Sequence, residues 1–160
     1  MSNTCFLVAN SSEAKIYEAY RGRLIRENEK GEDVLNLIKA LTHEESRKKV
    51  SDLVSDKSGN YPRKGSIASN GSTGTSGTFA EPTNPKELEA ERFARILAHE
   101  LDSLRYNAHW NDVFIVAAPH FQGLVNKYLS SPLQHLVTTI EKDYTHLNAR
   151  KLAKQLVAQL

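Results

Sequence analysis

The second half of the chain alternates helical stretches with short apolar runs, and this alternation constrains the fold more than any other sequence feature. Residues 113–116 are four consecutive apolar side chains, a pattern typical of a strand covered on both faces. Residues 135–142 are rich in β-branched side chains and predict a second strand. Helical patterns precede, separate and follow the two runs, so the sequence predicts a sheet with helices packed on it.

Start and stop signals place the helices of this half. Asn84 can cap a helix and Pro85 suits its first position, and the apolar stripe that follows ends near Asn107. Pro119 can open a second helix, and leucines at 152, 156 and 160 predict a third at the end of the chain.

The first forty residues predict a hairpin. Residues 4–9 form a short apolar run, residues 10–12 give a turn signal, and Ala14 and Ile16 alternate with polar neighbours as in a second strand. Gly22 suggests another turn, and Leu24 with Ile25 suggests the start of a third strand. Residues 34–41 match a helical stripe but are too short for periodicity alone to decide between helix and strand.

Composition indicates one globular domain over residues 1–160, with 39% hydrophobic and 25% charged residues. The formal net charge of +2 does not by itself favour nucleic acid, and a single cysteine rules out an intramolecular disulfide. We see no signal peptide and no apolar run long enough to span a membrane, so we expect a cytoplasmic protein. Whether copies of the chain associate with one another stays open.

Residues 46–84 change character. They are polar, with glycines and serines crowded into 69–77, and we expect a long disordered loop at about 58–82. The positive charges here could attract a phosphate backbone, and an aromatic ring among them could stack on an unpaired base. An ordinary solvated surface is the alternative. The residues concerned are Arg47, Lys48, Lys49, Lys57, Tyr61, Arg63 and Lys64.

A pocket is expected where the strand at 113–116 passes into the next helix, because ligands of α/β sheets gather at the carboxyl ends of strands. The candidate residues are Pro119, His120, Gln122, His43 and Asp143. Each also has a structural alternative, such as a helix start or a local ion pair. The six histidines are scattered without ligand spacing, so we expect no metal, and nothing indicates a cofactor.

Several short motifs together resemble a bacterial family known as host attachment proteins, or "protein required for attachment to host cells". They are VAN at 8–10, AKIY at 14–17, HEESR at 43–47, DLVSDKSG at 52–59, FA at 93–94, LA at 97–98, VAAP at 116–119, FQGL at 121–124 and KDYT at 142–145. They cover nearly the whole chain in order. The chain departs from the family at His120, where relatives usually carry a second proline, and residues 28–33 look like an insertion.

The resemblance implies a fold like the middle domain of archaeal and eukaryotic class-1 peptide-chain release factors, related to ribonuclease-H-like folds. We therefore expect a single mixed sheet of about five strands, with residues 35–41 as a strand. The Gly-Gly-Gln tip with which release factors act in peptidyl-tRNA hydrolysis is absent from this sequence.

Three functions remain open. The first is a non-enzymatic module that associates with RNA or the ribosome through the basic loop. The second is a factor for attachment to host cells, and the third is a hydrolase on a ribonuclease-H-like scaffold. We favour the first.

Overall fold

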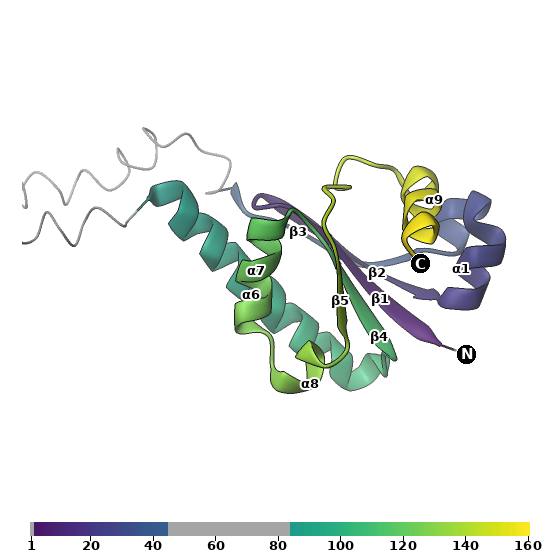
Figure 1. Ribbon diagram of the computed structural model, residues 1–160, viewed down its shortest axis with the longest axis horizontal. Helices are drawn as coiled ribbons and strands as arrows, with labels where there is room; N and C mark the ends of the chain where they lie inside the picture. The colour runs from purple at the N-terminus through teal and green to yellow at the C-terminus, as the bar shows by residue number, and fades with distance from the viewer. Residues whose placement is uncertain (1, 45–83) are drawn as a thin grey trace, which may run out of the picture.

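The computed structural model describes residues 2–44 and 84–160, which form one five-stranded mixed sheet in the order β3-β2-β1-β4-β5 (Figure 1). The strands are β1 (Asn3–Ala9), β2 (Glu13–Tyr20), β3 (Asn36–Thr42), β4 (Asp112–Val116) and β5 (Val137–Ile140). The predicted loop at 58–82 lies outside the described residues. Among the helices of the described ranges, none combines the length and apolar character needed to cross a bilayer.

The central strand, β1, joins the two halves of the chain. It pairs antiparallel with β2 on one side, where Leu7 faces Ile16, and parallel with β4 on the other, where Leu7 faces Ile115. β3 continues the sheet antiparallel to β2, and β5 continues it parallel to β4. Consequently β1, β4 and β5 all end at one edge of the sheet, where β2 begins and β3 ends.

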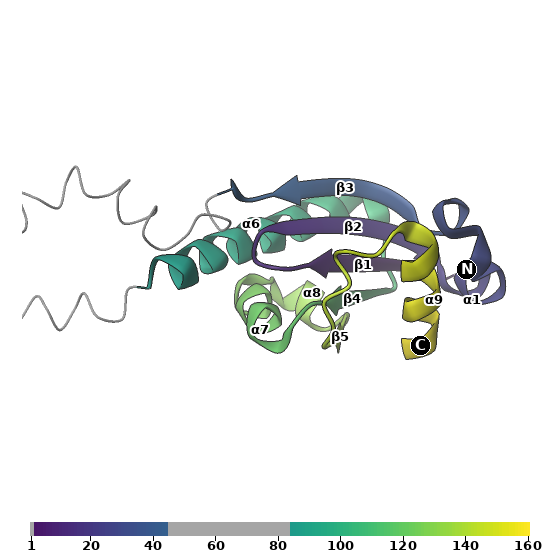
Figure 2. The same ribbon diagram turned by 90° about the horizontal axis from the view of Figure 1, so that it is seen from above.

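Helices cover both faces of the sheet (Figures 1 and 2). On one face lie α6 (Pro85–Ala108), α7 (Pro119–Tyr128) and the short α8 (Ser131–Gln134). On the other lie α1 (Arg21–Glu27), the 3₁₀ segment η1 (Asn28–Asp33) and α9 (Ala149–Gln159).

The two-residue alternation of strands divides the core into two halves. Cys5 and Leu7 of β1 point toward α6, where they meet Phe93 and Leu97, and Phe6 lies on the opposite face. The Phe6 ring stacks on Phe114 of β4 at a centroid distance of 5.3 Å. Burial on both faces explains the unbroken apolar run that predicted β4.

Most elements that the sequence predicts are confirmed. The α/β class, the N-terminal hairpin, the helices that open at Pro85 and Pro119, and a strand over residues 35–41 are all present, the last as β3. The predicted strand at 135–142 is shorter, at Val137–Ile140, and α8 was not predicted.

The strand expected from Leu24 and Ile25 is wrong, because both residues belong to helix α1. Leu24 is fully buried whereas Ile25 is 46% exposed, so the segment buries one side of a helical turn. Gly22 is likewise inside this helix and not in a turn.

Candidate functional site

The edge of the sheet where β1, β4 and β5 end brings together most of the polar side chains that the sequence singled out. Residues 43 and 44 follow β3 at this edge. Asn84, which caps α6, lies at the same end of the molecule (Figures 1 and 2). Glu44 and Asn84, the described residues on either side of the gap, therefore both lie at this edge.

His43 fastens the end of β3 to α6. Its backbone N–H donates to the Ser12 carbonyl at 2.8 Å, and its Nε2 lies 2.9 Å from Oε2 of Glu89. The imidazole ring stacks on Phe93 at a centroid distance of 5.3 Å. The His43 side chain is therefore mostly buried, and it links the end of β3 to α6.

Glu89 is a carboxylate that no sequence pattern singled out. It is only 3% exposed, and Arg92 Nη1 donates to its Oε1 at 2.6 Å while His43 holds the other oxygen. A carboxylate with so little access to water needs partners of this kind. The only sequence signal was an acid at a position facing inward on the helix.

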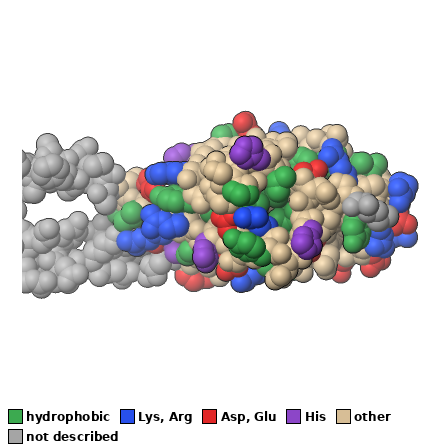
Figure 3. Space-filling view, turned by 90° about the horizontal axis from the view of Figure 1, so that it is seen from below, with side chains coloured by type: hydrophobic (Ala, Val, Ile, Leu, Met, Phe, Trp, Pro, Cys, Tyr) green, Lys and Arg blue, Asp and Glu red, His purple; other side chains and the backbone are tan. Residues whose placement is uncertain are grey.

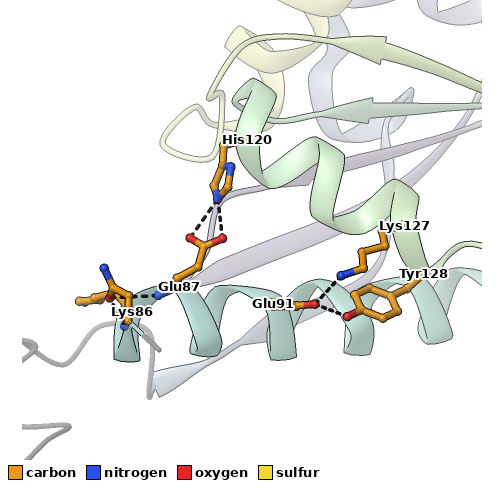
Figure 4. Close-up of polar contacts among 7 residues, drawn as sticks. Lys86, Glu87, Glu91, His120, Lys127 and Tyr128 are labelled. Atoms are coloured by element: carbon orange, nitrogen blue, oxygen red, sulfur yellow. Dashed lines mark hydrogen bonds and ion pairs between the residues drawn. The ribbon is translucent and has the colours of Figure 1, made fainter. Parts of the chain in front are cut away.

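His120 makes a second contact with α6, and this one is open to solvent. Pro119 occupies the first position of α7, and His120 Nε2 lies 2.8 Å and 2.9 Å from the two oxygens of Glu87 (Figure 4). The two side chains are 71% and 45% exposed, so the pair is accessible to a ligand but weakly held.

Gln122 does not join the histidines at the surface. It is 7% exposed and turned into the sheet, where its Nε2 donates to the carbonyl oxygens of Ile115 at 3.4 Å and Ile140 at 3.5 Å. Gln122 therefore bridges the ends of β4 and β5 from the first turn of α7.

Asp143 orders the loop after β5. Its Oδ1 accepts from the backbone N–H of Thr145 at 3.1 Å and from Thr145 Oγ1 at 2.6 Å. Asn10 Nδ2 in turn donates to Thr145 Oγ1 at 3.1 Å, and Asn10 Oδ1 accepts from the N–H groups of Ser12 and Glu13. The motif at 142–145 is thus tied to the turn between β1 and β2.

A second set of contacts between α7 and α6 is centred on Glu91. Figure 4 shows Lys127 and Tyr128 of α7 reaching this carboxylate of α6. Lys127 Nζ lies 2.9 Å from Glu91 Oε1, and the Tyr128 hydroxyl donates to the same oxygen. These two partners, the hydroxyl first, lower the pKa of Glu91 below its usual 4.5. Arg95 stacks over the Tyr128 ring at 4.8 Å.

The face formed by α6, α7 and α8 carries charges of both signs. In Figure 3, Lys and Arg side chains lie among hydrophobic and acidic ones, and histidines are scattered across the face. Within residues 2–44 and 84–160, no group of three or more His, Cys, Asp or Glu side chains could hold a metal ion.

The structure therefore brings His43, Pro119, His120 and Asp143 to one edge of the sheet, with Gln122 beneath. The predicted RNA-binding or partner-binding residues, Arg47, Lys48, Lys49, Lys57, Tyr61, Arg63 and Lys64, lie outside the described residues, and their role stays a prediction.

Comparisons with known proteins place the chain in context. A family model described as "Protein required for attachment to host cells" matches residues 5–156. The crystal structure of the archaeal translation termination factor aRF1 aligns with a TM-score of 0.49 and 13% identity, over 99% of this chain and 35% of that chain. The chain thus spans about a third of that solved structure. No curated protein matches.

Proposed function

This chain belongs to the family described as "protein required for attachment to host cells", and from that premise we propose that it acts as a non-enzymatic binding module whose target is RNA, free or within the ribosome. Family membership supports a role related to host attachment. The nature of the target is our proposal.

The observation that carries the proposal is the place at which residues 45–83 are inserted. The described residues that flank this segment lie at the edge of the sheet described above, where His43 contacts Glu89 and Asn84 caps α6. Residues 45–64 contain six Lys or Arg and three Asp or Glu, with Tyr61 among them. A segment of this charge attracts phosphate backbones, and its aromatic ring offers a surface for stacking.

The contacts at the edge support a binding role more than a catalytic one. Glu89 has both oxygens engaged, by His43 and Arg92, and Asp143 is engaged by Thr145. These side chains hold the ends of strands and helices in place, which suits a rigid platform from which a basic segment can reach a partner.

The test is binding of a fluorescent single-stranded RNA, and of purified ribosomes, over a series of salt concentrations. We expect affinity to fall with salt, since each contacted phosphate of a single strand contributes a slope of about −0.7 in log K against log salt. Replacing Lys48, Lys49, Arg63 and Lys64 by Gln should weaken binding and make the slope shallower by about 2 to 3.

A matched control removes four positive charges elsewhere. Arg26, Lys142, Lys151 and Lys154 are exposed in the described domain and form no ion pair with another described residue. Their replacement by Gln changes the net charge equally and should leave most of the affinity. Equal losses in both variants would reject the basic segment as the binding site. Binding that does not respond to salt would reject contact with phosphates, and absence of binding would reject RNA as the target.

The description of the family itself favours a second function, direct participation in attachment to host cells. Labelling of surface proteins on intact cells should then detect the protein, and deleting its gene should reduce attachment. Reduced attachment without surface labelling would support an indirect role, compatible with binding RNA inside the cell.

A further inference from the structure

A groove runs between η1 and the first turn of α9, on the face of the sheet opposite α6. Two adjoining cavities form it, with volumes of about 440 Å³ and about 450 Å³, and both are lined by Glu32, Asn148 and Ala149. The first cavity extends over β2 and β3, and the second lies between Lys30 and Arg150. Each volume is within the range of about 300–1,000 Å³ typical of small-molecule sites.

Tyr17 is the residue that most favours a ligand site in the first cavity. It lines this cavity and is only 4% exposed, yet its hydroxyl has no hydrogen-bond partner among residues 2–44 and 84–160. The ring is buried but the hydroxyl oxygen is not fully enclosed, so the hydroxyl opens onto the cavity and can donate to a ligand there. Burial, and secondarily the charge of Glu32, raise the pKa of Tyr17, so the hydroxyl stays protonated and can donate a hydrogen bond.

The walls of the cavity carry one charge of each sign. Lys15 of β2 and Glu32 of η1 both line it, and neither forms an ion pair with another described residue. Glu32 is exposed and Lys15 is half-buried, so water can solvate both charges, and a simple anion or cation would pair with only one of them. A molecule with both charges satisfies both.

The start of α9 adds donors for a negative group. The Asn148 side chain accepts from the backbone N–H of Lys151 at 2.9 Å, which leaves the N–H of Ala149 without a partner inside the helix. A helix N-terminus favours negative charge, and Ala149 lines both cavities.

The remaining wall is apolar. Leu35, Leu37 and Leu147 line the cavity, and Leu37 is 48% exposed although it lies on a strand. An exposed leucine beside a tyrosine hydroxyl that opens onto the cavity gives it both an apolar surface and polar groups that fix orientation, as ligand sites have.

We propose that this groove binds a free α-amino acid with an aliphatic or aromatic side chain. Its carboxylate is received by Tyr17, Lys15 and the first turn of α9, its ammonium group by Glu32, and its side chain by the three leucines. The site lies on the other face of the sheet from the α6–α7 surface and is independent of the proposed binding of RNA.

Titration calorimetry of the full chain with L-leucine and L-phenylalanine tests the proposal. We expect saturable binding of at least one, and weaker binding of L-leucinamide and N-acetyl-L-leucine, which lack one charge each. Tyr17→Phe keeps the ring and should lower affinity about tenfold, since hydrogen bonds to charged groups are worth that much. Glu32→Gln should weaken the binding of L-leucine but leave the binding of N-acetyl-L-leucine unchanged.

Glu29→Gln is the matched control, because Glu29 is an exposed acid of η1 that does not line the first cavity. It should bind L-leucine as the native chain does, and circular dichroism shows whether each variant is folded. The proposal fails if neither amino acid binds saturably, if inorganic phosphate binds more tightly than both, or if Tyr17→Phe leaves affinity unchanged in a folded protein.

Discussion

A few polar side chains join α7 to α6 near the surface. Glu91 receives the Tyr128 hydroxyl and Lys127, and His120 reaches Glu87 one turn earlier in α6. Phe93 and Phe121 supply an apolar contact between the same helices, with ring centroids 6.1 Å apart. The polar contacts lie near the surface, so each should contribute modestly to stability.

Glu91→Gln should reduce stability in a way that depends on pH. The pKa of Glu91 is lowered in the folded chain, so its contribution is present above the usual pKa of 4.5 and is lost as pH falls through the folded value. We expect the variant to unfold at lower denaturant concentration at pH 7, with the difference from the native chain shrinking below about pH 4.5. A difference that stays constant down to pH 3 would contradict this explanation.

At the scale of the element, the junction of η1 and α9 depends on a glycine. Gly31 has a φ of +54°, which side chains other than glycine adopt at a cost, and a Cβ added there would lie 3.0 Å from the backbone N and Cα of Arg150. Backbone atoms of a helix cannot move aside as a flexible side chain can. The close approach of η1 to α9 therefore requires glycine at this position.

Gly31→Ala should destabilise the protein by at least about 1 kcal/mol, the lower end of the cost of a left-handed residue. Gly123→Ala is the matched control, since Gly123 is inside α7 and an added Cβ would have nothing within 4 Å. That substitution should stabilise by about 0.5–1 kcal/mol through helix propensity. The free energy of unfolding in denaturant measures both, and equal effects of the two substitutions would refute this interpretation.

The elements differ in how far the sequence predicted them. The helix at 85–108 has a cap, a proline and a long stripe, and β4 has an unbroken apolar run, so local signals sufficed for both. The prediction for α1 failed because its seven residues, which follow β2 directly and continue into η1, show too little periodicity. The burial of Leu24 also depends on α9 from the far end of the chain. β3 was ambiguous by periodicity because, as an edge strand, it buries little on either face.

The site was predictable in part, because some of its residues adjoin elements that local signals predict. His43, Pro119, His120 and Asp143 follow or precede predicted strands and helices, so their shared edge follows from the parallel pairing of β1, β4 and β5. Glu89, Glu87 and Tyr17 could not be placed, because their roles depend on contacts between elements distant in sequence. Trp110, whose Nε1 donates to Glu18 at 2.7 Å, is another such case.

At the scale of the whole molecule, the domain has two buried cores on the two faces of one sheet, both built from residues 2–44 and 84–160. The segment at 45–83 is inserted between β3 and α6, whose adjoining ends are joined by the contact of His43 with Glu89. We propose that this domain folds as a platform and that the inserted segment supplies the affinity for RNA.

The RNA affinity of a chain in which residues 45–83 are replaced by a flexible Gly/Ser linker of about ten residues separates the two contributions. We predict that this shortened protein unfolds cooperatively, as the full chain does, and loses nearly all salt-dependent binding of single-stranded RNA. A folded shortened protein that binds RNA as tightly as the full chain would contradict the claim, and so would a shortened protein that cannot fold.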